Sequence, residues 1–93
     1  MALRLGIVGC GNIAQRYAER IRALDELELV AAYDALPGRA DALVGEFGGE
    51  AQPSLAALLG DERVDAVVNL TFPAAHAEVT AAALEAGKHV HSE

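Results

Sequence analysis

The sequence predicts an α/β domain built on a doubly wound parallel sheet of about five strands. Short apolar runs alternate from end to end with segments whose apolar residues recur every three or four positions. The runs are apolar throughout, which is typical of parallel strands buried on both faces. Hydrophobic residues make up 53% of the chain and aromatic residues only 4%, so alanine, leucine and valine must supply the core. Alternating strands and helices with right-handed crossovers place helices on both faces of such a sheet.

The first half is expected to contribute two strands and two helices. Residues 3–9 and 27–34 are the apolar runs of two buried strands. Between them, apolar residues at intervals of four, four and three predict a helix with a core-facing stripe of Ile13, Tyr17, Ile21 and Leu24. A second helix is expected from about Pro37, since proline suits a first turn, to the Gly48–Gly49 pair. Its expected stripe is Ala40, Leu43, Val44 and Phe47.

The second half continues the alternation. Residues 50–54 are expected to hold a very short third strand, and Pro53–Ser54 to start a short leucine-rich helix. Residues 64–71 predict a fourth strand and residues 74–86 another helix. Gly87 then stands where a left-handed cap belongs, and residues 88–93 predict the fifth strand.

Size and charge exclude several classes of function. With 93 residues the chain is long enough for one domain. A net charge of −7 argues against a nucleic-acid partner, because no basic stripe is present to neutralise phosphates. The sequence shows neither an 18-residue apolar run nor a signal-peptide pattern, and its single cysteine cannot form an internal disulfide. We therefore expect a cytoplasmic protein with no membrane partner.

A glycine-rich turn joins the first strand to the first helix. Residues 9–14 read G-x-G-x-x-A. In this pattern Gly9 permits the tight turn, Gly11 lets a pyrophosphate approach the main chain, and Ala14 lets the helix pack closely on the sheet. The helix N-terminus supplies free amide groups and a positive dipole end for the phosphates. The backbone itself is therefore the expected binding surface.

An acidic residue follows at a matching distance. Asp34 ends the second predicted strand, 20 residues after Ala14, the spacing at which a carboxylate reaches the ribose hydroxyls of a dinucleotide. A carboxylate accepts a hydrogen bond from the 2′-hydroxyl and repels a 2′-phosphate, so NAD is favoured. Arg39 is positioned to offset that repulsion, which leaves NADP open. The alternative is an ordinary strand–helix turn in which Asp34 caps the next helix.

A second group of side chains follows the fourth predicted strand. Thr71, Phe72 and Pro73 come directly after it, and His76 lies near the start of the next helix. At the carboxyl end of a strand near the switch point, these side chains are expected to face the nicotinamide half of the cofactor. For His76, packing or capping at the helix start is the alternative.

Three motifs in this order resemble those of the glucose–fructose oxidoreductase, inositol dehydrogenase and rhizopine-catabolism (Gfo/Idh/MocA) oxidoreductase family. They are LGIVGCGNIA, the T-x-x-x-x-H spacing of residues 71–76, and EAGKHV followed by Glu93. The resemblance implies a Rossmann-like fold and NAD or NADP as cofactor. It carries over Gly9, Gly11, Asn12, Ile13 and Ala14 as dinucleotide contacts and Asp34 as the ribose acceptor, and it places Thr71, Pro73, His76 and Glu93 around the nicotinamide.

The chain departs from the family pattern at two places. Phe72 stands where the family has proline, and Pro73 comes one position later, so a different loop shape is expected beside the nicotinamide. The sequence ends at Glu93, one residue before the family's E-K-P lysine. We therefore expect residues 1–93 to be a truncated dinucleotide-binding domain that lacks the C-terminal α/β substrate domain and, with it, the catalytic residues.

Two functions follow from these expectations. In the first, the parent protein transfers hydride between a nicotinamide cofactor and a sugar, polyol or related hydroxyl compound, and the 93-residue chain alone is inactive. In the second, the chain is a non-catalytic nucleotide-binding or sensing module, or an engineered stand-alone domain. In either case the exposed edge of the fifth strand predicts self-association or a homo-oligomer, and a small-molecule substrate binds only with the missing domain.

Two further patterns are not expected to carry chemistry. His89, His91 and Glu93 alternate on one strand face and contain zinc-binding residue types, but this spacing arises in any strand and seldom converges on one ion. Cys10 has no base beside it in the sequence, so it is not expected to act as a nucleophile. Its place before a helix favours the thiolate and predicts that it can be oxidised.

Overall fold

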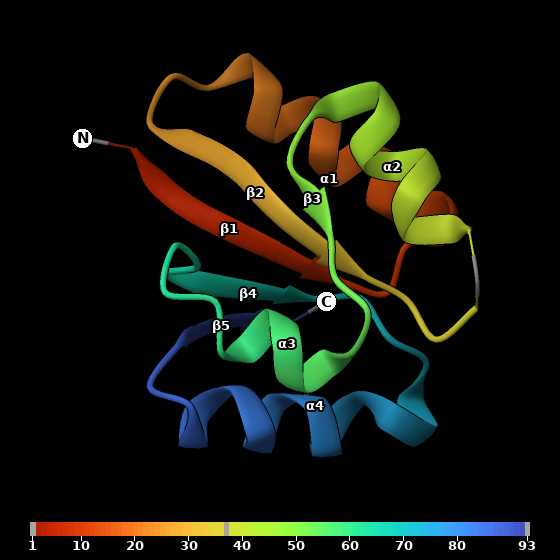
Figure 1. The fold of residues 1–93 in the computed structure, drawn as a ribbon, viewed down its shortest axis with the longest axis vertical. Coiled ribbons are helices and arrows are strands. Elements are labelled where there is room, and N and C mark those ends of the chain that lie inside the picture. The colour runs from red at the N-terminus through yellow and green to blue at the C-terminus, as the bar shows by residue number, and fades with distance from the viewer. Residues whose placement is uncertain (1, 37, 93) are drawn as a thin grey trace.

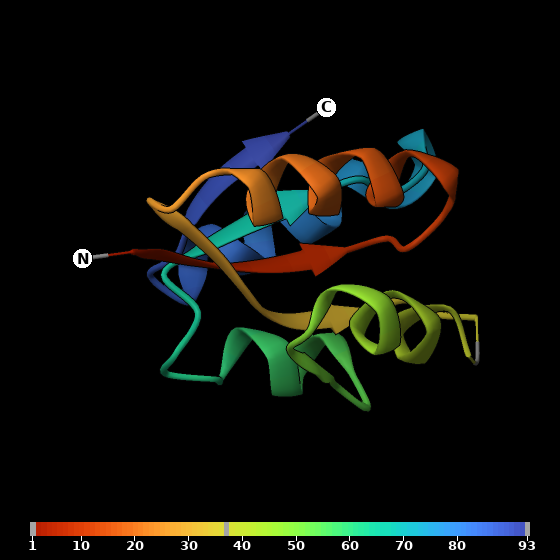
Figure 2. The same ribbon diagram turned by 90° about the horizontal axis from the view of Figure 1, so that it is seen from above.

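The computed structural model describes residues 2–36 and 38–92 and contains a single parallel sheet with helices on both faces (Figures 1 and 2). The order of the strands is β3-β2-β1-β4-β5. The strands are β1 (Leu3–Val8), β2 (Leu27–Tyr33), β3 (Glu50–Ala51), β4 (Ala66–Asn69) and β5 (His89–Ser92). The helices are α1 (Asn12–Ala23), α2 (Arg39–Phe47), α3 (Leu55–Leu59) and α4 (Pro73–Glu85). The chain therefore reverses its winding direction between β1 and β4, which confirms the doubly wound prediction.

Each face of the sheet has its own apolar core. Helices α1 and α2 cover one face, and α3 and α4 cover the other (Figure 1). Successive residues of β1 alternate between the two cores, so that Ile7 packs under α1 while Val8 packs on the opposite side. Residues Val67 and Val68 of β4 divide in the same way. This explains why the strand sequences are apolar at every position rather than at every second one.

The strand register brings the functional segments together. Val8, the last residue of β1, pairs with Tyr33 at the end of β2 and with Asn69 at the end of β4. Asn69 in turn pairs with Ser92 at the end of β5. Parallel strands that end level with one another release their following loops at one edge, and Figure 1 shows these loops gathered at the same end of the sheet. In open α/β sheets this is the edge where ligands bind.

The predicted elements all appear, with shifted boundaries. The fourth strand is shorter than predicted, and the second helix begins at Arg39; Pro37, its predicted start, lies outside the described residues. Gly48 and Gly87 have φ angles of +92° and +80° and follow the two helices that they were predicted to end. No helix in the described ranges combines the length and apolar character needed to cross a membrane.

The predicted stripe of α1 is partly wrong. Ile21 is buried and Tyr17 packs partly against the core, but Ile13 is 39% exposed and Leu24 is 49% exposed. The buried side chains of α1 are instead Ala14, Ala18 and Ile21. Alanine at the contact lets the helix axis approach the sheet closely, which leaves Ile13 at the rim beside the loops. Leu24 is the C-cap residue and lies beyond the last helical turn.

Candidate functional site

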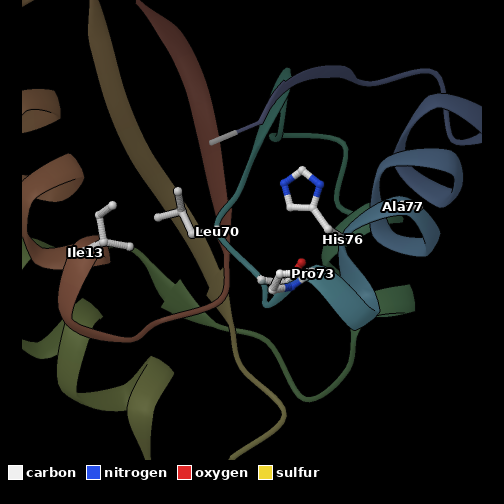
Figure 3. Close-up of a pocket in the computed structure, with 6 residues that line it drawn as sticks. Ile13, Leu70, Pro73, His76 and Ala77 are labelled. Atoms are coloured by element: carbon white, nitrogen blue, oxygen red, sulfur yellow. The ribbon is translucent and has the colours of Figure 1, made fainter.

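Two adjoining pockets lie along the carboxyl edge of the sheet. The larger, which we call the Asp34 pocket, has a volume of about 1010 Å³ and is lined by the segments that follow β1, β2 and β4. The smaller, the His76 pocket, has a volume of about 480 Å³ and lies between the start of α1 and the start of α4 (Figure 3). Ile13, Leu70 and Thr71 line both pockets. The two pockets meet at these shared residues, beside the N-terminus of α1, and we refer to them together as the groove.

Gly9 is required by the packing of the protein itself. Its φ angle is +95°, in the left-handed region that favours glycine. A Cβ atom at this position would lie 2.8 Å from the carbonyl carbon of Leu70 and 2.9 Å from its oxygen. The Gly9 amide also donates a hydrogen bond of 2.9 Å to the Tyr33 carbonyl. Gly9 thus lets the turn after β1 pass directly against the chain that leaves β4.

Gly11 has a different role, because nothing in the fold requires its lack of a side chain. Its φ angle is −82°, and the nearest atom to an added Cβ would be Nη1 of Arg39 at 3.7 Å. Gly11 is the N-cap of α1, and no side chain among the described residues caps this helix. The amide groups of the first turn, those of Asn12 and Ile13, therefore face the groove without a side-chain acceptor, in the arrangement that binds anions.

Ala14 lies below the turn rather than in the groove. It is fully buried in the core between α1 and the sheet and lines neither pocket. Its contribution to the site is the close approach of α1 to the sheet, which sets the height of the helix N-terminus above the strand ends.

Asp34 ties the turn after β1 to the end of β2. Its Oδ2 accepts a hydrogen bond of 2.7 Å from the Cys10 amide, and its Oδ1 accepts one of 2.7 Å from the Leu36 amide. Gly38, not Asp34, is the N-cap of α2, so the helix-capping alternative does not describe its role. Each carboxylate oxygen has a further lone pair for a ligand hydroxyl. The two backbone contacts hold the carboxylate in the Asp34 pocket.

Arg39 brings positive charge to the same place. It is the first residue of α2 and lines the Asp34 pocket, and its Nη1 would lie 3.7 Å from a Cβ added at Gly11. A guanidinium presents several fixed donors that match phosphate oxygens. The N-terminus of α1 and Arg39 therefore offer positive potential to one small volume, whereas Asp34 offers acceptors beside it.

Cys10 corrects one prediction. Burial, followed by the nearby Asp34 carboxylate, raises the pKa of its thiol to about 12. Its Sγ is 3.5 Å from the Tyr33 carbonyl oxygen and donates to it. The expectation that the helix N-terminus favours a thiolate at this position is wrong, because loss of hydration and the negative charge of Asp34 outweigh the dipole. Cys10 is a packed, neutral thiol.

The His76 pocket contains the second predicted group. Thr71, Pro73 and His76 line it together with Ile13, Leu70 and Ala77, and Figure 3 shows the imidazole ring directed away from α4 into this space. Nε2 of His76 is buried and has no hydrogen-bond partner within the described part of the chain. The N-cap of α4 is Phe72, so His76 does not cap the helix. Its unpartnered nitrogen is available to a polar atom of a ligand. Glu93 lies outside the described residues.

Asn69 lines neither pocket but braces residues that do, and the sequence reasoning missed it. It is fully buried at the end of β4 and is the one buried polar side chain of the described ranges. Its Nδ2 donates to the His76 carbonyl and to Oγ1 of Thr80, both at 2.9 Å. Its Oδ1 accepts from Oγ1 of Thr71 at 2.6 Å and from the Thr71 amide at 3.2 Å. Asn69 thus fixes the loop between β4 and α4; a lone amide within an apolar strand was the signal for it.

The two histidines of β5 do not form a metal site with other described residues. No group of three histidine, cysteine, aspartate or glutamate side chains in the described ranges is placed to hold an ion. The ring of His91 instead lies 6.0 Å from that of Tyr17, measured between centroids.

Comparison with known proteins agrees with this geometry. Residues 3–93 match the Gfo/Idh/MocA family, described as an oxidoreductase family with an NAD-binding Rossmann fold. Inositol 2-dehydrogenase 3 of Saccharopolyspora erythraea is 38% identical over 94 residues, covering 100% of this chain and 28% of that protein. The dTDP-3,4-didehydro-2,6-dideoxy-α-D-glucose 3-reductase of Actinomadura kijaniata is 40% identical, covering 98% of this chain and 28% of that protein.

Solved structures give the same result. The 3-ketoreductase KijD10 from Actinomadura kijaniata, crystallised with NADP and TDP-benzene, superposes with a TM-score of 0.94 at 35% identity, covering 99% of this chain and 29% of that chain. A biliverdin reductase from Synechocystis, crystallised with biliverdin and NADP⁺, superposes with a TM-score of 0.89 at 37% identity, covering 97% of this chain and 28% of that one. The chain spans under a third of the length of these relatives. It belongs to the Gfo/Idh/MocA oxidoreductase family and has that family's NAD-binding Rossmann fold.

Proposed function

We propose that residues 1–93 form the cofactor-binding domain of an NAD(P)-dependent oxidoreductase that acts on a sugar, polyol or related hydroxyl compound. The observation that carries the proposal is the space above Gly11. An added Cβ there would meet only Nη1 of Arg39, at 3.7 Å, and the space faces the N-terminus of α1, which has no side-chain cap among the described residues. A diphosphate is the group whose charge and size match this position.

The rest of the cofactor follows from the diphosphate position. In this assignment Gly9, Gly11, Asn12 and Ile13 form the turn around the phosphates. Asp34, held by the amides of Cys10 and Leu36, accepts from the adenosine ribose. The nicotinamide half then extends over Ile13 into the His76 pocket.

In the His76 pocket the chain binds and orients. Nε2 of His76 exchanges a hydrogen bond with a polar atom of the nicotinamide riboside, and Thr71 and Pro73 form the adjacent wall. Glu93, which matches the family's glutamate, belongs to the same group in this assignment. The cofactor, when bound, supplies the hydride chemistry. Hydride transfer requires a substrate carbon within about 3–3.5 Å of the nicotinamide, and we assign that positioning to a separate C-terminal α/β domain.

The substrate class is proposed from the relatives. Two proteins that match nearly the whole chain are named for inositol, a cyclic polyol, and for a dTDP-linked dideoxy sugar. We further propose a cytoplasmic location and self-association through β5, which is an edge strand whose residues are mostly exposed. Sedimentation of a monomer at high concentration contradicts the self-association.

A thermal-shift comparison tests the cofactor assignment. A ligand that binds only the native state at about 100 times its Kd stabilises it by about 2.7 kcal/mol. For a domain of this size that corresponds to a rise in Tm of about 10 °C or more. We expect this rise with NAD and with ADP-ribose. The absence of any shift with NAD, NADP and ADP-ribose contradicts the proposal.

The choice between NAD and NADP depends on two side chains. We propose NAD, because the carboxylate of Asp34 is held in the pocket by two backbone amides and repels a 2′-phosphate. Replacing Asp34 by serine removes the repulsion and leaves Arg39, so the variant should bind NADP more tightly than the wild type does. Asp34→Ser, Arg39→Gln is the matched control, in which this gain should disappear. Unchanged NADP affinity in Asp34→Ser contradicts the assignment.

A further inference from the structure

Phe72 is an aromatic side chain that the fold leaves in solvent. It is 79% exposed, more than any other large hydrophobic residue in the described ranges. It is the N-cap residue of α4 and its backbone is extended, with φ −63° and ψ 157°. It stands where the family pattern has proline. A ligand that covers an exposed phenyl ring removes apolar surface from water, which favours binding.

Phe72 and the residue that follows it line different pockets. Pro73, the next residue, lines the His76 pocket, whereas Phe72 lines the Asp34 pocket. A second exposed apolar side chain, Leu36, lines the same pocket and is 51% exposed. Leu36 follows β2 and Phe72 follows β4, so the two side chains come from different loops.

These positions define what the ring can meet. The following step rests on the proposed function, in which Asp34 accepts from the adenosine ribose and the diphosphate lies over Gly11. Adenine is attached to that ribose, so the base must occupy the Asp34 pocket. Its flat faces are apolar and stack on aromatic rings. Three exposed large apolar side chains line this pocket, those of Phe72, Leu36 and Ile13. Ile13 is shared with the His76 pocket, which leaves Phe72 and Leu36 for the adenosine side.

We propose that Phe72 is the stacking platform for the adenine base, with Leu36 as the second apolar wall. This changes the meaning of the departure from the family pattern. The phenylalanine in place of proline adds binding surface on the adenosine side of the groove, whereas the sequence alone predicted a changed loop beside the nicotinamide.

The test uses Phe72→Ala, Phe72→Leu and Phe72→Trp, titrated with ADP-ribose, NAD and nicotinamide mononucleotide by calorimetry. A base–aromatic stack is worth a factor of about 5 to 150 in affinity. We expect Phe72→Ala to weaken ADP-ribose and NAD by the same factor within that range, and to leave nicotinamide mononucleotide unchanged. Phe72→Trp should retain the wild-type affinity. Leu84→Ala is the matched control, since Leu84 is 59% exposed on α4 and lines neither pocket.

A spectroscopic readout separates stacking from general apolar contact. The adenine H2 and H8 resonances of bound ADP-ribose should move upfield with the wild-type chain, because they lie over the ring, and this movement should be lost in Phe72→Leu. Wild-type affinity in Phe72→Ala overturns the inference, as does an equal loss for nicotinamide mononucleotide, which indicates a displaced loop. A wild-type chain that binds none of the three ligands instead contradicts the proposed function, and the inference with it.

Discussion

Replacing Gly9 by alanine places a methyl group where the chain that leaves β4 already lies. The new Cβ would be 2.8 Å from the Leu70 carbonyl carbon and 3.0 Å from the Thr71 amide nitrogen. Both neighbours are backbone atoms, so no side-chain rotation relieves the overlap. The residue would also keep a φ angle of +95°, which disfavours any side chain.

The magnitude follows from these two effects. A non-glycine residue in the left-handed region costs about 1–2 kcal/mol, and inserting a methyl group into a packed position costs about 1–3 kcal/mol. Alanine offsets about 0.4–1 kcal/mol of this loss, because it lowers the conformational entropy of the unfolded chain. We therefore expect the free energy of unfolding of Gly9→Ala to fall by about 1–5 kcal/mol, a large share of the total for a small domain.

Gly11→Val is the matched comparison on the same turn. An added Cβ meets only Nη1 of Arg39, at 3.7 Å, so no backbone atom opposes it. Because valine is a poorer N-cap than glycine, we expect the free energy of unfolding to fall by about 1 kcal/mol or less. The same side chain fills the proposed diphosphate position, and binding of NAD and ADP-ribose should be lost.

Urea unfolding followed by circular dichroism, with calorimetric titration of ADP-ribose, measures both quantities. Gly9→Ala should be the more destabilised of the two, and Gly11→Val should stay folded but be unable to bind. A Gly9→Ala variant as stable as the wild type refutes the packing argument. A Gly11→Val variant that binds ADP-ribose normally refutes the assignment of the diphosphate.

Three further predictions concern single side chains. Asn69→Ala should lower the unfolding free energy by about 2–4 kcal/mol in urea titrations, because it removes four hydrogen bonds; a loss below about 1 kcal/mol contradicts the bracing role. Cys10 should react with a thiol reagent at pH 8 only on unfolding, because its pKa is raised to about 12 in the folded state. The stability that the neutral thiol adds should be present below the ordinary pKa of 9.0 and lost as the pH rises toward 12. Rapid reaction of the native thiol at pH 8 contradicts this prediction. Nη2 of Arg63 donates a hydrogen bond of 2.7 Å to Oδ2 of Asp61, and the hydrogen bonds from Arg63 lower the pKa of Asp61 to about 2. Their stabilisation should be present above the ordinary pKa of 3.8 and lost as the pH falls toward 2. In Arg63→Gln the carboxyl resonance of Asp61 should titrate closer to 3.8, and an unchanged midpoint contradicts the pairing.

The order and type of every element were predictable from the sequence because each element of this fold has a local sequence pattern. Buried parallel strands are apolar at all positions, and glycines with positive φ angles follow α2 and α4. The stripe of α1 was misassigned because hydrophobic periodicity counts large side chains, whereas the contact with the sheet depends on small ones. Ala14 and Ala18 make that contact, and Ile13 is left at the rim.

The site was predictable to the extent that it is built from the backbone. Gly9, Gly11 and Asp34 were singled out from spacing alone, and the structure places all three along the Asp34 pocket; their role in binding a dinucleotide stays a prediction. Asn69 was missed because its role depends on partners up to 11 residues away on another element. The neutral state of Cys10 was missed because burial and the Asp34 contact exist only in the folded chain.

The central claim is that the uncapped N-terminus of α1 binds the cofactor's diphosphate. A titration of the ¹⁵N-labelled chain with ADP-ribose, followed by amide chemical shifts, tests it most directly. The account predicts that the amides of Gly11, Asn12 and Ile13 show the largest shifts and saturate together. Shifts confined to other parts of the chain, with these three amides unmoved at saturation, would contradict it.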